Sequence, residues 1–237
     1  MIKNIINFLK IFFVYFFNLF FFIKKSKKKI EFKPMFFDFK YKEPFDPHYL
    51  YHTSWAARKI MQIQPKLHYD FGSDLRFITI FSSVIKIQYF NLSVSNIKLD
   101  NLSFQIADLT NLHEIKNNSL DSVSCMHVIE HVGLGRYGDK VDLDGDLKAF
   151  NELKRVVSVD GNLLIVVPLG KPKVVYNAHR IYSYQEIIDL MTNFKLVEFS
   201  LIQDDAYENG MTLNANYNIV QKNDYACGCF WFKKISE

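Results

Sequence analysis

The chain has 237 residues, of which 49% are hydrophobic and 16% aromatic, so it is too apolar for an intrinsically disordered protein. With 9 Gly and 6 Pro it is also too poor in chain breakers for a collagen-like or low-complexity protein, and its length fits one domain with an appendage. Residues 1–33 carry eight Lys and one Glu, whereas the remaining 204 residues carry 21 basic and 24 acidic side chains. The body is therefore mildly acidic, which removes the composition-based argument for a nucleic-acid partner.

The N-terminal segment is the most apolar part of the chain. Residues 2–23 hold 8 of the 23 Phe, and a Lys-rich flank follows at residues 24–29. A helix of this length could span a bilayer core of about 30 Å. Its polar residues gather on one helical face, which is also typical of a helix lying in the interface: these are Lys3, Asn4, Asn7, Lys10 and Asn18.

The Lys-rich flank favours anionic headgroups and the cytoplasmic side of a membrane. We therefore expect residues 1–29 to form a membrane-associating helix and flank, and the protein to be cytoplasmic, at the inner face of the membrane. A buried or partner-binding helix and a signal peptide are the alternatives, although no small-x-small cleavage site follows the apolar run.

Residues 30–46 are interpreted as a linker and residues 47–237 as the folded domain. A helix is predicted over residues 47–62, with Asp46 as its N-cap and Pro47 in its first turn. Short apolar runs then alternate with helical stretches. The predicted strands are 67–71, 85–90, 102–106, 122–126 and 162–168, and the predicted helices are 75–83, 147–157 and 184–192.

This alternation predicts an α/β fold with a mostly parallel sheet and helices on both faces. Residues 195–201 and 227–233 would add two strands, as an antiparallel pair at one edge, which makes the sheet seven-stranded. In such a sheet, ligands bind beyond the carboxyl ends of the strands, near the point where the strand order reverses. Four strand ends therefore carry the candidate site: Asp70 lies at the end of the first strand, Gly72 and Ser73 follow it, and Asn91, Asp108 and His127 follow the next three strands.

The three cysteines are too few for a disulfide framework, and Cys227-x-Cys229 has no second cysteine pair, so we predict no metal site there. His127-x-x-Glu130-His131 also spells HxxEH, the pattern of a zinc hydrolase, which stays open as a minor alternative. That motif needs a helix at His127, whereas the preceding residues read as a strand. Residues 142–146 are interpreted as a solvated loop that starts the helix at 147.

The segments DFGS, YFN, ADL and SCMHVIEHV, followed by a helix and the strand NLLIVVP, resemble class I S-adenosylmethionine-dependent methyltransferases. CMHVIEHV resembles a segment of small-molecule O-methyltransferases. With GKPKVVYNAHRIYSY and the terminal CGCFWFKK, the chain is similar to a methyltransferase-like domain family of unknown function. The resemblance covers residues 46–237 and is strongest over 121–184.

The resemblance implies a Rossmann-like fold that binds S-adenosylmethionine. By position, Asp70, Gly72 and Ser73 match the first cofactor loop, Asn91 the ribose position, Asp108 the adenine position, and His127 the residue after the fourth strand. The loop has one glycine where the family usually has two or three, and Asn91 replaces the usual acidic residue. A non-catalytic domain that acts as a binding or scaffold module at the membrane is therefore the main alternative.

The predicted reaction is methyl transfer to oxygen or nitrogen of a small-molecule or glycan-type acceptor. Such a transfer often needs a base to remove a proton from the acceptor. The candidate catalytic residues near the strand ends are Glu130, His131 and His179. The glycine-rich residues 133–139 are a candidate lid over the site.

Overall fold

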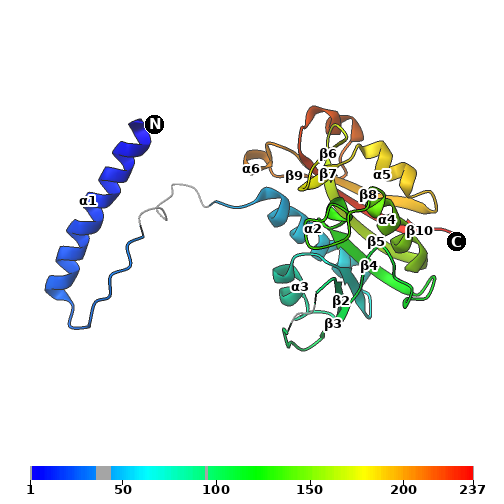
Figure 1. Cartoon of the computed structure of the whole chain (residues 1–237), viewed down its shortest axis with the longest axis horizontal. Helices are drawn as coiled ribbons and strands as arrows, with labels where there is room; N and C mark the ends of the chain where they lie inside the picture. Colours follow the sequence, from blue (N-terminus) through cyan, green and yellow to red (C-terminus); the bar gives the residue numbers. More distant parts are fainter. Residues whose placement is uncertain (1, 36–43, 94–95, 237) are drawn as a thin grey trace. The chain divides into compact units, whose positions relative to one another are not determined.

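The computed structural model describes residues 2–35, 44–93 and 96–236, and the side chains of residues 2–7 are outside the description. The chain divides into two compact units, Met1–Phe45 and Asp46–Glu237 (Figure 1). The predicted linker at 30–46 lies partly outside the described residues, at 36–43.

The first unit consists of helix α1, Ile2–Lys25, and the chain that follows it. Several large apolar side chains on α1 are exposed, among them Phe13 at 70% and Phe17 at 75%. Lys24 and Lys25 place their ammonium groups over the rings of Phe20 and Phe21. Within the described part of the chain, no helix has both the length and the apolar character that crossing a bilayer requires.

The second unit begins with helix α2, Pro47–Ile63, whose first turn is stabilised as the sequence predicts. The Asp46 side chain accepts hydrogen bonds from the backbone N–H groups of His48 and Tyr49, and Pro47 occupies the first helical turn. Trp55, Ala56 and Ile60 form the buried face of the helix.

A single large sheet organises this unit, and the predicted α/β class with helices on both faces is confirmed. Its strands lie in the order β3-β2-β1-β4-β5-β10-β8-β9. The strands are β1 (His68–Phe71), β2 (Ile87–Asn91), β3 (Leu102–Ile106), β4 (Leu120–Met126), β5 (Val157–Leu169), β8 (Phe194–Ile202), β9 (Met211–Thr212) and β10 (Ala226–Lys234). Strands β3, β2, β1, β4 and β5 pair in parallel, and the order reverses between β1 and β4.

Two details of the predicted sheet need correction. The strand β10 does not lie at an edge, because it is inserted between β5 and β8 and is antiparallel to both. The short strand β9 extends the sheet beyond β8, so the sheet has eight strands in place of the predicted seven. A two-residue strand has too little periodicity to be recognised in the sequence.

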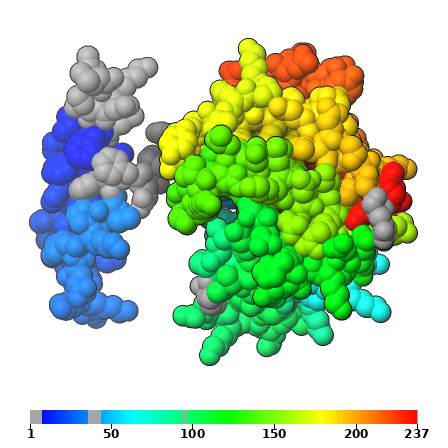
Figure 2. Space-filling model, turned by 45° about the vertical axis from the view of Figure 1, so that its right-hand side comes forward, coloured from blue at the N-terminus to red at the C-terminus, as the bar shows by residue number. Residues whose placement is uncertain are grey.

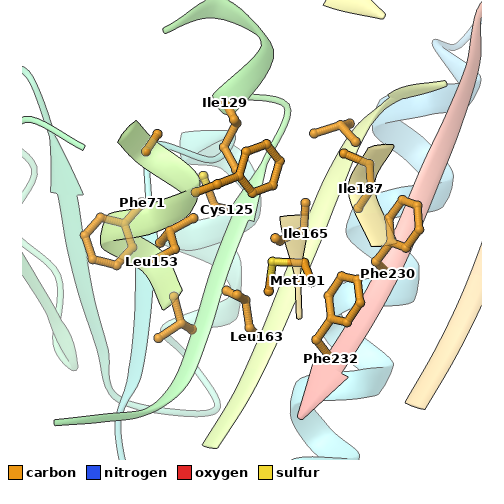
Figure 3. Close-up of a cluster of buried hydrophobic side chains, with 14 of the residues drawn as sticks. Phe71, Cys125, Ile129, Leu153, Leu163, Ile165, Ile187, Met191, Phe230 and Phe232 are labelled. Atoms are coloured by element: carbon orange, nitrogen blue, oxygen red, sulfur yellow. The ribbon is translucent and has the colours of Figure 1, made fainter. Parts of the chain in front are cut away.

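Helices cover both faces of the sheet. Helices α4 (Gly145–Val156) and α5 (Tyr184–Leu190) pack against one face, where Leu153, Ile165 and Phe230 belong to one buried cluster (Figure 3). Helices α2 and α3 (Leu75–Phe81) pack against the other face. Because helices shield both faces from solvent, the central strands β4 and β5 consist largely of buried residues, as expected for a parallel sheet.

Several elements differ from the sequence-based prediction. Strand β5 begins at Val157, directly after α4, and not at the predicted residue 162, and its backbone is irregular at Asp160, which has φ 64°. The hairpin of β6 (Lys173–Val175) and β7 (His179–Ile181), the short helix α6 (Ala206–Asn209) and two 3-10 helices, η1 (Ile129–His131) and η2 (Tyr217–Lys222), were not predicted.

Candidate functional site

A cavity of about 580 Å³ opens at the carboxyl ends of β1, β2 and β4, beside the point where the strand order reverses. All its lining residues lie between Tyr49 and Asp142, within the second unit. The space-filling view shows a hollow among the teal and green segments that contribute these residues (Figure 2). A cavity of this size, at this place in a doubly wound sheet, fits a small-molecule ligand.

Gly72 provides the floor of the cavity where β1 turns toward α3. Its φ is +75°, and its N–H donates to the carbonyl of Phe90 at 2.9 Å. A Cβ at this position would lie 3.2 Å from both methyl carbons of Val128. The turn therefore requires glycine, because a side chain would be strained and would crowd the cavity.

Asp70 and Ser73 flank Gly72, but they lie beneath the cavity and do not line it. The buried carboxylate of Asp70 accepts the Ser73 N–H at 2.9 Å and the Ser73 hydroxyl at 2.7 Å, and it also accepts the hydroxyl of Ser124 on β4. Burial raises the pKa of Asp70 to about 6, although these three hydrogen bonds oppose the shift. Through these contacts, Asp70 and Ser73 stabilise the loop that contains Gly72.

His68 continues this buried network. Its Nδ1 lies 2.8 Å from the Ser122 hydroxyl and its Nε2 lies 2.8 Å from the Ser124 hydroxyl. Because the Ser124 hydroxyl donates to Asp70, it accepts from His68 Nε2–H, which fixes the tautomer of the neutral ring. Complete burial lowers the pKa of His68 to about 3. The network ties β1 to β4 directly below the site.

Asn91 and Asp108 line the cavity, as the positions after β2 and β3 suggest. Asn91 accepts the Leu92 N–H on Oδ1 and donates from Nδ2 to the Tyr89 hydroxyl, so its amide is oriented by its own strand. Asp108 accepts both the N–H and the hydroxyl of Thr110 on Oδ1. Its Oδ2 remains able to accept a hydrogen bond from a ligand amine.

His127 lines the cavity directly after β4, with φ +55°. Its Nδ1 lies 2.8 Å from Glu130 Oε1, and its Nε2 lies 3.3 Å from Cys227 Sγ. Burial lowers the pKa of His127, but contacts with Cys227 and Glu130 outweigh burial, and the net pKa is well above its usual value. Because only the three-residue helix η1 follows, the helix that the HxxEH zinc hydrolase motif needs is not formed at His127.

Two of the three predicted catalytic residues lie close together, but only His131 lines the cavity. His131 Nδ1 lies 2.6 Å from the carbonyl of Ala178, so Nδ1 is the donor and Nε2 of the neutral ring carries the lone pair. Glu130 is 1% exposed, and its Oε1 lies 3.8 Å from His131 Nε2. Its Oε2 is buried without a hydrogen-bond partner among the described residues.

His179 lies outside the cavity lining and packs against Tyr225, with ring centroids 4.9 Å apart. Burial lowers the pKa of His179, and the electrostatic interaction with His131 lowers this pKa further. Its neighbour Arg180 is buried and points elsewhere. It donates to the carbonyls of Val132 and Leu143, which holds the chain between them in place.

The interpretation of residues 142–146 as a solvated loop is wrong for Asp146, which is 5% exposed. Asp146 Oδ2 lies 3.4 Å from Arg180 Nε and accepts the Tyr182 hydroxyl at 3.0 Å. The candidate lid is also tightly packed at its start, because a Cβ on Gly133 would lie 2.1 Å from the Asp142 carbonyl oxygen. Asp139 accepts the N–H groups of Gly133 and Gly135 and closes this turn.

The sequence did not indicate four residues of the cavity wall: Tyr49, Asp74, Lys140 and Asp142. Tyr49 lies in the first turn of α2, which precedes β1 in the sequence, so no pattern at the end of a strand indicates it. Tyr137 and Asp139 also line the cavity, and both lie in the glycine-rich segment 133–139 that the sequence indicates as a lid over the site.

The chain is similar to one protein family and to several solved structures. The family model described as "Caenorhabditis protein of unknown function, DUF268" matches residues 77–226. None of the curated proteins matches the chain.

Among solved structures, 1,6-didemethyltoxoflavin-N1-methyltransferase of Burkholderia thailandensis, with bound 1,6-didemethyltoxoflavin and S-adenosylhomocysteine, has a TM-score of 0.56 at 13% identity, over 78% of this chain and 79% of that chain. The putative methyltransferase bound to the Haloferax volcanii activator Trm112 has a TM-score of 0.54 at 13% identity, over 81% and 91% of the two chains.

A putative sarcosine dimethylglycine methyltransferase from Galdieria sulphuraria has a TM-score of 0.53 at 11% identity, over 78% of this chain and 85% of that chain. At these identities the likeness shows the fold alone. The Rossmann-like fold of class I methyltransferases, which the sequence resemblance implies, is confirmed.

Proposed function

The chain belongs to the DUF268 family of proteins of unknown function, and we propose that it is an S-adenosylmethionine-dependent methyltransferase. The observation that supports this function best is the cavity beside the β1–β4 order reversal, in a fold shared with solved methyltransferases. The cavity brings together Gly72, Asn91, Asp108 and His127 from the ends of four structural segments. These are four of the six positions that the family resemblance assigns to the cofactor, and the other two, Asp70 and Ser73, lie beneath the cavity.

The residues present fit the cofactor. The glycine at 72 leaves the backbone accessible for the amino acid part of the ligand. The amide of Asn91 would hold the ribose hydroxyls, and Asp108 Oδ2 would accept the exocyclic amine of adenine. Apolar walls from Phe71, Phe90 and Leu109 would pack on the base, but the ribose contact would lack charge assistance, since Asn91 is neutral.

When bound, S-adenosylmethionine supplies a methyl group on a sulfonium that leaves as a thioether. The chain would orient the acceptor in line with that methyl and accept the proton that the acceptor releases. His131 is the best-placed base, because its Nδ1–H is engaged by Ala178 and its Nε2 lone pair belongs to a ring that lines the cavity. The acceptor would be a small molecule or a glycan, methylated on oxygen or nitrogen.

Calorimetry with the full-length protein tests this function. We expect saturable binding of S-adenosylmethionine and S-adenosylhomocysteine, with no binding of ATP as a matched adenine-containing control. The competing function, a methyltransferase-fold module that only binds a partner at the membrane, is suggested by the single loop glycine and by Asn91. Absence of binding heat at millimolar S-adenosylmethionine would favour that module.

We also propose that α1 and its Lys-rich flank attach the protein to an anionic membrane surface on the cytoplasmic side. Exposed rings at Phe12, Phe16 and Phe20, on the helix face opposite the polar residues, would enter the acyl boundary, while Lys10 and the flank would meet the headgroups. Clustered lysines next to apolar rings are the combination that gives stable attachment, since either signal alone binds weakly.

Vesicle sedimentation tests this attachment. The full-length protein should sediment with vesicles that contain phosphatidylserine and much less with vesicles of phosphatidylcholine alone. The double substitution Phe12→Asp and Phe16→Asp should release it, whereas Phe32→Asp, outside α1, should not. Equal sedimentation of the double variant and the wild type would refute the proposed attachment.

A further inference from the structure

Three potential metal ligands meet beside the cavity, from three different elements. They are His48 in the first turn of α2, His127 after β4, and Cys227 at the start of β10. Their ligand atoms all lie within 4.8 Å of one another, and Cys227 Sγ is 3.3 Å from His127 Nε2. Only His127 of the three also lines the cavity, so the cluster is a separate site that adjoins it.

The donor set is that of a zinc-type ion. Imidazole and thiolate are the ligands that Zn²⁺ prefers, with bonds of about 2.0–2.1 Å to nitrogen and about 2.3 Å to sulfur. Tetrahedral coordination with these bonds places the nitrogen and sulfur about 3.5 Å apart. The observed 3.3 Å between His127 and Cys227 is close to this separation. His48 is half-buried in the first turn of its helix, and its ring stacks on Tyr225 and His127 with centroids 5.1 and 5.6 Å apart.

The surroundings of His127 complete the pattern. A metal-binding histidine usually donates its second ring N–H to a carboxylate, which fixes the tautomer and makes the other nitrogen more basic. Here Glu130 Oε1 lies 2.8 Å from His127 Nδ1, which leaves Nε2 to face the cluster. The carboxylate is almost fully buried, so solvent does not compete for this bond.

His52 supplies an independent observation. It is 0% exposed, and its ring packs edge-on against His127 with the centroids 5.1 Å apart. His52 Nδ1 donates to the His48 carbonyl at 2.7 Å, so Nε2 of the neutral ring carries a lone pair. That buried Nε2 has no hydrogen-bond partner among the described residues. His52 therefore places an unsatisfied buried acceptor on a ring that contacts the ligand His127.

We propose that His48, His127 and Cys227 bind a divalent ion of the zinc class, with Glu130 orienting His127. Three protein ligands leave a fourth coordination position for water or for an electron-rich atom of another molecule, which is the arrangement of metal sites that take part in chemistry. The sequence predicts no metal ligands here, because the three residues are spread over 180 positions of the chain. His127 is shared with the cofactor cavity, whereas His48 and Cys227 lie outside its lining, so variants of these two residues test metal binding separately from cofactor binding.

Metal reconstitution of the full-length, tag-free protein tests the site. The protein is stripped with a chelator, reconstituted with Zn²⁺ and measured by metal analysis and by competition with a chromophoric chelator. We expect one Zn²⁺ per chain, and we expect His48→Ala and Cys227→Ser each to weaken binding by at least about tenfold. Co²⁺ in the wild type should show a thiolate charge-transfer band that Cys227→Ser removes.

Matched variants separate ligation from general damage. His113→Ala removes an exposed histidine, and Cys229→Ser removes a buried thiol two residues further along β10, so both should keep the metal and the Co²⁺ band. His48 is half-buried, so its variant reports on the site even where Cys227→Ser fails to fold. Less than about 0.1 Zn²⁺ per wild-type chain, or unchanged affinity in a folded His48→Ala protein, would overturn the proposal.

Discussion

Asp70 Oδ1 accepts the backbone N–H of Ser73 at 2.9 Å, and this bond closes the loop that carries Gly72. The same carboxylate accepts the hydroxyls of Ser73 and, across the sheet, Ser124. Asp70, which the family resemblance assigns to the cofactor, therefore holds the loop in its shape. It lies below the cavity rather than in its wall.

Removing this carboxylate should destabilise the protein. Asp70→Ala leaves a buried N–H and two buried hydroxyls without their acceptor, which we expect to cost about 2–4 kcal/mol of unfolding free energy. Urea unfolding measures this loss. Asp205→Ala, at the exposed start of α6, is the control and should stay close to the wild type. Similar stability of the two variants would contradict the loop-holding position of Asp70.

The pH dependence of stability should reveal Asp70 and His68 together. The native pKa of Asp70, about 6, exceeds its ordinary value of 3.8, so its contribution to stability grows as pH falls through 6. The native pKa of His68, about 3, lies below its ordinary value of 6.5, so its contribution shrinks as pH falls below 6.5. In the wild type the two effects oppose each other between about pH 6 and pH 4.

Asp70→Asn removes only the first of these effects. The variant should therefore lose stability on acidification more steeply than the wild type, by about 1.4 kcal/mol per pH unit. Urea midpoints at pH 7, 6 and 5 provide the comparison. Parallel curves for the two proteins would show that Asp70 is already ionised with an ordinary pKa in the folded state.

Gly72→Ala should weaken binding of S-adenosylmethionine by at least about tenfold. The new Cβ would be strained at φ +75° and would press on Val128 at the cavity wall. Gly210→Ala is the matched control, because Gly210 has φ +77° but lies outside the cavity lining. If both variants bound the ligand as the wild type does, the cofactor loop would be misplaced in this account. Gly72→Arg should abolish binding outright.

Arg180→Ala should loosen the chain between Val132 and Asp146. The substitution leaves Asp146 buried without its cation and frees two backbone carbonyls, and breaking such a buried pair costs about 3–5 kcal/mol. Limited proteolysis should then cut within residues 133–145, which the wild type protects. Arg76→Ala breaks an exposed ion pair instead and should leave the cleavage pattern unchanged. Unchanged protection in Arg180→Ala would show that other contacts hold this segment.

The sequence predicts the elements whose signals are local. The N-cap at Asp46, the bounds of β3 and the alternation of strands and helices all follow from short-range chemistry, and they are confirmed. Strands of two or three residues, such as β9, contain at most one and a half periods of the two-residue alternation and were missed.

Side-chain roles were harder to predict, because they depend on partners that are distant in the chain. Asp70 lies near the end of its strand, where a cofactor residue is expected, but its carboxylate accepts a hydrogen bond from Ser124, 54 positions away in the chain. The sequence around Asp146 is typical of a solvated loop, but in the structure Asp146 is buried beside Arg180. The meeting of His48 with His127 and Cys227 depends on how α2, β4 and β10 pack, which no spacing in the sequence encodes.

The crystal structure of the full-length protein with S-adenosylhomocysteine would test the central claim most directly. This account predicts the ligand in the cavity, with its amino acid part over Gly72, its ribose at Asn91 and its adenine at Asp108. Electron density for the ligand at another site, or a cavity that stays empty at saturating ligand, would contradict it.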